Sequence, residues 1–252
     1  QMLDIPGEGL KGVVQGLEFL HEHKRGNITR INGTVIVVGG GNVAVDSART
    51  AVRLGASKVT IIYRRDMAQM PAAKEDIREA QREGVHIKLM SSPIELRGSN
   101  GKVVEVICQN MVLGKPDESG RSRPLPKEGS TFSLPADKVI LAVGQRVDLS
   151  FLERSPIGAN ANTIHINERT LETVFPGIFA AGDVVTGPAT VIEAIAAGLR
   201  AAVSIRQYLK GEEITGDFFP TRADDGKPPY RMEEYPQKSE RVSARFLPLN
   251  QR

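Results

Sequence analysis

The sequence predicts an α/β fold built on a parallel β-sheet, and three observations lead to this prediction. The run Thr34–Val38 is short, apolar and β-branched, as in a strand that is buried on both faces. Small and apolar residues then recur with helical spacing over Asn42–Leu54, and Gly55 is suited to end that helix. A second β-branched run, Val59–Tyr63, follows. Strand, glycine-rich turn, helix and strand together make one βαβ unit, whose two strands are parallel.

The remaining elements follow from residue spacing and from turn residues. Apolar residues recur at steps of three or four over Gly9–Lys24, which predicts a helix. Two further helices are expected over Ala72–Glu83, which is rich in Ala, Glu, Lys and Arg, and over Val191–Leu209, which is alanine-rich at its start. Short apolar or alternating runs predict further strands over Val85–Met90, Lys138–Val143 and Ile178–Ala181. Two more strand segments flank a glycine-rich turn and predict a small antiparallel meander, over Ile94–Leu96 and Lys102–Leu113. Proline, glycine and charge predict an exposed loop at Gly114–Pro135 and an extended tail after Gly211.

Composition narrows the classes of protein to which the chain can belong. The 252 residues carry 33 basic and 30 acidic side chains, a near balance that favours neither nucleic acid nor an acidic membrane as partner. We find no apolar run long enough to span a bilayer. The single cysteine, Cys108, excludes a disulfide within the chain and indicates a reducing compartment, so we expect a cytoplasmic location. No histidine or cysteine pattern predicts a metal site, and no catalytic side chain is named.

A glycine-rich turn joins the first strand of the βαβ unit to its helix. The run Gly39-Gly40-Gly41-Asn42-Val43-Ala44 fits the pattern G-x-G-x-x-G/A in the context that gives this pattern its value. Gly39 permits a tight turn, Gly41 lets the backbone approach a pyrophosphate, and Ala44 lets the helix pack closely on the strand. The helix N-terminus attracts phosphate. The sequence therefore predicts a Rossmann-like dinucleotide site, and the alternative is a turn without a ligand.

The end of the second strand determines which dinucleotide is expected. A site for NAD usually places Asp or Glu there to accept from the ribose hydroxyl groups. This chain has Arg64 and Arg65 instead, and guanidinium groups can bind a 2′-phosphate through paired hydrogen bonds. We therefore expect NADP(H). Asp66 argues the other way because it is acidic and directly follows, and the arginines could instead be a solvated strand end.

Several motifs in one order resemble the small (beta) subunit of NADPH-dependent glutamate synthase and its flavoprotein relatives. The resemblance covers about residues 3 to 210. Its motifs are the runs Val37–Asp46, Tyr63–Asp66 with Met70–Ala72, Pro116–Arg121, Ala136–Gln145 and Gly177–Asp183. In that family an NADPH domain is inserted within an FAD domain. The resemblance implies hydride transfer from nicotinamide C4 to flavin N5, followed by single-electron transfer to iron–sulfur clusters of a partner domain or subunit.

The resemblance also implies cofactor contacts outside the first glycine turn. Ala142 and Gly144 are expected beside the nucleotide. Gly182 and Asp183 match the second flavin motif of the family, in which the Asp holds the ribityl–pyrophosphate region of FAD. A helix N-terminus formed by Pro188, Ala189, Thr190 and Val191 is expected beside the isoalloxazine, where it would stabilise negative charge. The alternative for Asp183 is an ordinary turn or helix-capping residue.

The chain also departs from the family pattern. The first FAD motif and the N-terminal cluster-binding cysteines of the family are absent, and Leu3–Glu8 resembles the segment that follows the first FAD half. We therefore expect a fragment that is inactive alone. Its expected parts are an FAD-domain connector (1–9), an NADP(H)-binding domain (10–146), the C-terminal part of a second, FAD-binding Rossmann-like domain (147–210) and a tail (211–252).

Other functions remain open at this point. One is an NADP-binding domain with a non-catalytic role, and another is the corresponding module of a ferredoxin–NADP oxidoreductase. A self-sufficient dehydrogenase ranks last, because it needs a proton donor near the nicotinamide and the sequence has no Tyr-x-x-x-Lys or comparable pair.

Overall fold

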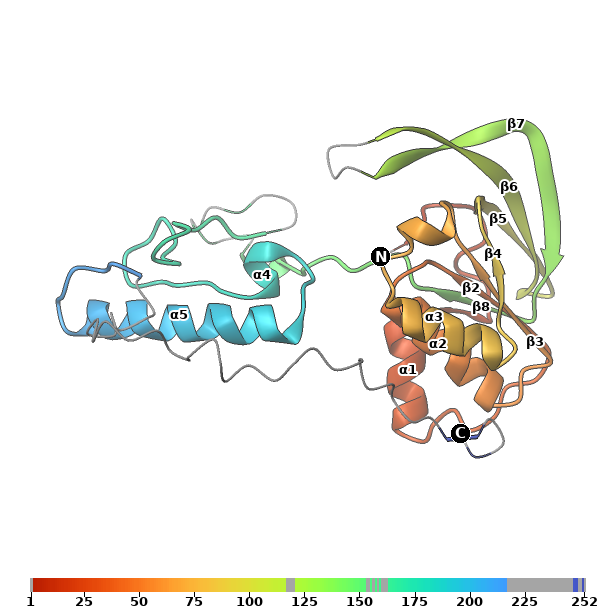
Figure 1. Ribbon diagram of the computed structural model, residues 1–252, viewed down its shortest axis with the longest axis horizontal. Coiled ribbons are helices and arrows are strands. Elements are labelled where there is room, and N and C mark those ends of the chain that lie inside the picture. The colour runs from red at the N-terminus through yellow and green to blue at the C-terminus, as the bar shows by residue number, and fades with distance from the viewer. Residues whose placement is uncertain are drawn as a thin grey trace, which may run out of the picture. The chain divides into compact units, whose positions relative to one another are not determined.

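The structure is a computed structural model that describes residues 2–116, 121–152, 155, 157, 159, 163–216, 247–248 and 251. It contains two compact units (Figure 1). The first comprises residues 1–144 together with 246–252, and the second comprises residues 145–245. Among the described residues, no helix is long and apolar enough to cross a membrane.

A parallel sheet forms the centre of the first unit, as the βαβ pattern predicted. Its strand order is β1-β8-β2-β3-β4. The strands are β1 (Val13–Gln15), β8 (Lys138–Leu141), β2 (Thr34–Val38), β3 (Lys58–Ile62) and β4 (His86–Lys88). All neighbouring pairs are parallel, so the carboxyl ends of β2, β3 and β8 lie at one edge. Ligands of open α/β sheets bind at that edge.

An antiparallel meander forms a second sheet, and this prediction is also confirmed. It consists of β5 (Ser91–Ser99), β6 (Lys102–Pro116) and β7 (Ser122–Pro135) in sequence order. The turn between β5 and β6 uses Asn100 and Gly101, whose φ angles are +50° and +74°. Two consecutive positive φ angles are typical of the tight turns that match the twist of a hairpin.

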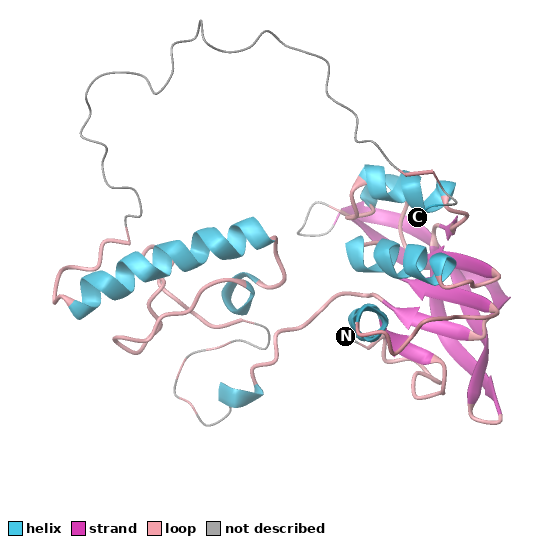
Figure 2. Cartoon of the chain, turned by 90° about the horizontal axis from the view of Figure 1, so that it is seen from below, coloured by secondary structure: helices cyan, strands magenta, loops and turns pink. Residues whose placement is uncertain are grey.

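Alternating residues of the parallel strands build two cores, one on each face of the sheet. Val35, Val37 and Ile61 face α1 (Gly16–Lys24), α2 (Asn42–Arg53) and α3 (Lys74–Arg82). Ile36, Val38 and Ile62 face the meander. The first unit therefore has three layers, with helices on one face of the parallel sheet and the meander on the other (Figure 2). Burial on both faces explains why β2 reads as a continuous apolar run.

Two predicted elements of the first unit were wrong. The helix expected over Gly9–Lys24 begins only at Gly16, because Val13–Gln15 pairs with β8 as an edge strand. Gly12 has φ +94°, which interrupts the helical pattern before that strand. The loop expected over Gly114–Pro135 is largely β7, which pairs with β6 despite three prolines. Edge strands tolerate proline because one side of their backbone needs no partner.

The second unit contains η2 (Ser150–Leu152), α4 (Asp183–Thr186) and α5 (Val191–Leu209). The predicted bounds of α5 are confirmed. The strand expected over Ile178–Ala181 is wrong, because the structure has only one bridge there, between Glu172 and Phe179. Phe179 packs edge-on against Tyr208 of α5, with ring centroids 6.0 Å apart. Most of the tail after Gly211 lies outside the described residues.

Candidate functional site

The glycine turn lies at the carboxyl edge of the parallel sheet, between β2 and α2. Gly39 has φ +139°, and a Cβ on it would overlap the backbone carbonyl of Ala142. The turn is held on both sides, because the Gly39 amide donates to the Ile62 carbonyl at 3.0 Å and the Ala142 amide donates to the Val38 carbonyl at 2.8 Å. Glycine is therefore required at position 39 for the backbone alone, whether or not a ligand binds.

The next two glycines have different surroundings. A Cβ on Gly40 would stand 2.5 Å from Cε2 of Tyr63, so this position packs against the ring. A Cβ on Gly41 would meet only Cγ of Pro71, at 3.9 Å, so the space beside it is open. Gly41 is the N-cap of α2, and none of the described side chains caps the helix there. Backbone amides and the helix dipole at such an uncapped helix N-terminus attract phosphate groups.

The residues after the glycines attach the helix to the sheet and to the following loop. Ala44 is completely buried, as its predicted packing role requires. Val43 packs towards α1, because its Cγ1 would lie 2.9 Å from a Cβ placed on Gly16. The Asn42 side chain accepts from the Ala73 amide at 3.2 Å. Asn42 therefore holds the loop that precedes α3.

The loop after β3 closes against the glycine turn from the other side. The Ala72 amide donates to the Gly40 carbonyl at 3.1 Å. The Tyr63 hydroxyl donates to the Gln69 carbonyl at 2.7 Å, which fixes the ring that Gly40 contacts. The contact between Tyr63 and Gly40 was not predictable from the sequence, because no local pattern indicates it.

The structure places the two arginines differently. Arg64 is exposed at the end of β3. Arg65 is 5% exposed, and its Nε donates to the Ser122 carbonyl of β7 at 2.9 Å. Asp66, whose acidic side chain favours NAD(H) in the sequence pattern, caps the short helix η1 (Met67–Gln69). Its two carboxylate oxygens accept from the backbone amide and the side chain of Gln69.

The residues expected beside the nucleotide after β8 lie at the same edge as the glycine turn. Ala142 contacts Gly39 through its backbone, as described above, and Gly144 has φ +108°. The first unit thus brings together its predicted site residues from the ends of β2, β3 and β8.

The predicted flavin-contacting residues lie in the second unit. Gly182 has φ +74° and precedes α4, and the first α4 residue, Asp183, accepts from the Ala189 amide at 3.3 Å. Thr190 caps α5 in a reciprocal arrangement with Glu193, and these hydrogen bonds lower the pKa of the Glu193 carboxyl. Pro188, Ala189, Thr190 and Val191 are all exposed. Asp183 therefore acts as a turn-stabilising residue within this chain.

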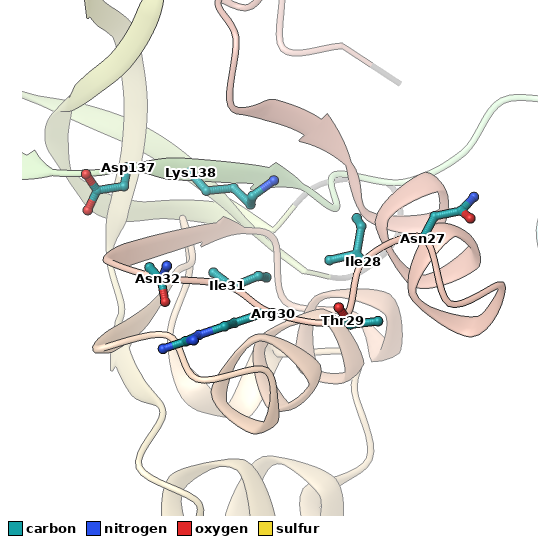
Figure 3. A pocket seen from close by; sticks show the side chains of 8 residues that line it. All are labelled: Asn27, Ile28, Thr29, Arg30, Ile31, Asn32, Asp137 and Lys138. Carbon is teal, nitrogen blue, oxygen red and sulfur yellow. The ribbon is translucent and has the colours of Figure 1, made fainter.

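A shallow pocket of about 380 Å³ lies at the opposite edge of the parallel sheet (Figure 3). Asn27–Asn32, which precede β2, line it together with Asp137 and Lys138 at the start of β8. The Asp137 carboxylate accepts from the Thr34 amide at 2.7 Å, so it supports the strand start. We place the candidate site at the glycine turn rather than here, because only that edge combines a helix N-terminus with an open glycine. Within the described residues, no cluster of three or more His, Cys, Asp or Glu side chains is suited to a metal.

Comparisons with known proteins agree with this fold and sequence pattern. Residues 1–198 match the family described as pyridine nucleotide-disulphide oxidoreductase. The chain is 46% identical over 204 residues to the NADP(+)-dependent formate dehydrogenase subunit beta of Moorella thermoacetica. The aligned region covers 81% of this chain and 29% of the relative. It is 41% identical over 221 residues to a putative glutamate synthase (NADPH) small chain of Cereibacter sphaeroides, and this alignment covers 82% of this chain and 53% of the relative. The chain thus spans about half the length of these relatives or less.

Two solved structures show the same fold at low sequence identity. FprA of Mycobacterium tuberculosis in complex with NADPH has a TM-score of 0.65 at 20% identity, covering 84% of this chain and 62% of FprA. Thioredoxin reductase of Lactococcus lactis has a TM-score of 0.66 at 24% identity, covering 84% and 63%. The family match extends over most of the chain, and the predicted relationship to glutamate synthase small subunits is confirmed. The chain belongs to the pyridine nucleotide-disulphide oxidoreductase family.

Proposed function

We propose that the first unit binds NADP(H) at the glycine turn. The chain would serve as the NADPH-input part of a flavin-dependent oxidoreductase of the glutamate synthase small-subunit type. The observation that carries this proposal is the open space beside Gly41 at the N-terminus of α2. At the same sheet edge, Arg64 lies two residues after the end of β3 and is exposed. A pyrophosphate at the helix and a 2′-phosphate at the strand end match the two acidic groups of NADP(H).

The hydrogen bonds that Asp66 accepts within the chain support NADP(H) over NAD(H). An acidic residue at the end of the second strand favours NAD when its carboxylate accepts from the ribose hydroxyl groups. Both carboxylate oxygens of Asp66 already accept hydrogen bonds from Gln69. Asp66 is thus already used within the chain, as the cap of η1. The names of relatives point the same way, since one is an NADP(+)-dependent dehydrogenase subunit and another an NADPH-dependent small chain.

We propose that the second unit contributes to an FAD site together with segments of a longer protein. The supporting observation is the surface of α5, which is apolar on more than one side. Ala201 and Ser204 are buried within the unit, whereas several large apolar residues are exposed. These are Val191, Ile192, Ile195, Leu199 and Leu209. An apolar helix face of this length normally packs against another element.

In the complete protein, NADPH would supply a hydride to FAD, and electrons would pass to an iron–sulfur domain or subunit. The residues of this chain would bind and orient the two cofactors, because hydride transfer needs positioned cofactors more than an acid or a base. Several relatives are named as beta or small subunits, which supports a partner subunit. This proposal includes the cofactor contacts expected from the sequence and the domain limits 1–9, 10–146, 147–210 and 211–252. It also includes a cytoplasmic location and the inactivity of this chain alone.

Calorimetric titration with NADP⁺ and NAD⁺ tests the nucleotide part. We expect NADP⁺ to bind at least about tenfold more tightly, a difference of about 1.4 kcal/mol. Arg64→Ala should abolish this preference. Arg30→Ala is the matched control, because Arg30 is also exposed but lies at the opposite edge of the sheet. Equal binding of the two nucleotides, or tighter binding of NAD⁺, would contradict the proposal.

A further inference from the structure

The helix α1 begins at the same edge of the parallel sheet as α2. β1 is parallel to β8, with Gln15 opposite Leu141, and α1 starts at Gly16 directly after this strand. The two helices also pack on the same face of the sheet, where Phe19 of α1 and Ala48 of α2 belong to one core. Gly16 lies outside the pattern G-x-G-x-x-G/A, so that pattern assigns it no role.

A side chain at position 16 would collide with residues of the candidate site. A Cβ there would stand 2.9 Å from Cγ1 of Val43, 3.2 Å from Cβ of Ala142 and 3.4 Å from the Leu141 carbonyl oxygen. Both carbon–carbon distances are shorter than the usual contact of about 3.5–4.0 Å. The side formed by β8 is fixed, because the Ala142 amide donates to the Val38 carbonyl at 2.8 Å. A methyl group at position 16 would therefore press on Val43.

Val43 is the second residue of α2, so pressure on its side chain acts on the first turn of that helix. Valine is stiff at χ1, and only one of its three staggered rotamers leaves the position of Cγ1 without a methyl group. The amides of the first turn have no partner within the helix and are the groups that bind phosphate at a helix N-terminus. The close approach of Gly16 to Val43 thus influences where these amides lie.

We infer that Gly16 is a positioning residue of the dinucleotide site. Because Gly16 has no side chain, α1 can begin directly against Val43 and Ala142. The first turn of α2 then keeps the place in which its backbone amides would bind the pyrophosphate. This inference rests on the proposed function and adds to it a residue outside the βαβ unit. Gly16 acts through Val43 and needs no contact with the nucleotide for this role.

A double-mutant cycle between positions 16 and 43 tests this role in the full chain. Gly16→Ala should weaken NADP⁺ and NAD⁺ binding by the same factor, about tenfold, because both nucleotides carry the pyrophosphate. In a Val43→Ala background, where Cγ1 is missing, Gly16→Ala should change either affinity by less than about twofold. Gly198→Ala is the matched control, since Gly198 is also helical but a Cβ there would meet no atom within 4 Å.

Unfolding in denaturant and amide NMR spectra separate this role from loss of the fold. Gly16 is helical and has no positive φ, so alanine can adopt its backbone conformation. We expect Gly16→Ala to remain folded and to shift the amide signals of residues 41–45 without nucleotide, and we expect smaller shifts in the Val43→Ala background.

Three results would overturn the inference although NADP(H) binding stands. These are wild-type affinity in Gly16→Ala, an equal loss of affinity in the Val43→Ala background, and a Gly16→Ala chain that does not fold even in that background. A wild-type chain that binds neither nucleotide would instead contradict the proposed function itself.

Discussion

The ring of Tyr63 fills the space that a side chain at position 40 would need. A Cβ on Gly40 would stand 2.5 Å from Cε2 of the ring and 2.6 Å from Cδ2. The ring cannot move away easily, since Tyr63 is 7% exposed and its hydroxyl donates to the Gln69 carbonyl. The glycine loop and the strand end, which would hold the pyrophosphate and the 2′-phosphate of the dinucleotide, are therefore in direct contact.

The first prediction concerns this contact. Gly40→Ala should lower the free energy of unfolding by about 1–3 kcal/mol, the usual effect of inserting a methyl group into a packed site. Denaturant unfolding measures this change. Gly9→Ala is the control, because a Cβ there would meet no atom within 4 Å. A Gly40→Ala protein as stable as the control would show that Tyr63 moves freely.

Gly41→Ala should separate ligand binding from folding. The added methyl group meets only Pro71 Cγ at 3.9 Å, and Gly41 has φ −87°, which alanine adopts without strain. We expect a stability change below about 1 kcal/mol, mainly from the poorer N-cap. NADP⁺ affinity should fall at least about tenfold, because the methyl group enters the space proposed for the pyrophosphate. Normal NADP⁺ affinity in this variant would place the phosphates elsewhere.

The ionisation of Glu83 should make the free energy of unfolding depend on pH. Burial of its carboxyl, which is 4% exposed, raises its pKa, but hydrogen bonds and charge from Arg49 and Arg53 outweigh burial and hold the pKa at about 2. Because the folded pKa lies below the ordinary value of 4.5, the stabilisation is complete above about pH 4.5 and is lost as the pH falls towards 2. Glu83→Gln should therefore lower the unfolding free energy at pH 7, by about 1–3 kcal/mol.

Urea denaturation of the wild type and of Glu83→Gln at pH 7 and pH 3 measures this effect. The difference between the two proteins should shrink at pH 3. Glu75→Gln is the matched control, since Glu75 is exposed on the same helix and should change stability little at either pH. A Glu83→Gln difference that stays constant with pH would show that the carboxylate charge contributes nothing.

Cys108 should react slowly with thiol reagents while the protein is folded. The side chain is fully buried on β6, and burial raises the pKa of the thiol to about 12, although Lys88 partly opposes this shift. Only the thiolate reacts at an appreciable rate. At pH 8 we therefore expect modification to be limited by unfolding, with one thiol per chain reacting promptly in denaturant. Rapid modification of the folded protein would mean that β6 opens locally.

The elements with a strong local sequence pattern were predicted correctly. The apolar run of β2, the small residues of α2 and the alanine-rich start of α5 all lead to elements that the structure confirms. The glycine turn was also recognisable, because its neighbours on both sides identify it as a strand-to-helix turn.

Elements that depend on distant partners were not predictable in this way. Val13–Gln15 becomes a strand because β8 lies beside it, although the residues before Gly16 have helical spacing. β7 forms despite its prolines because β6 supplies hydrogen-bonding partners along its length. Arg64 and Arg65 are identical neighbours in sequence, but Arg64 is exposed whereas Arg65 is buried and donates to the distant Ser122 carbonyl. Pairing across such separations outweighs local preference in each case.

Binding of adenosine fragments tests the central claim most directly. We would titrate the isotope-labelled chain with 2′,5′-ADP and with 5′-AMP, and follow backbone amides by NMR. The account predicts that 2′,5′-ADP binds at least about tenfold more tightly, because it alone carries the 2′-phosphate. The amide shifts should be concentrated at residues 39–44 and at Arg64. Equal affinity for the two fragments, or shifts confined to the pocket around Arg30 and Asp137, would contradict it.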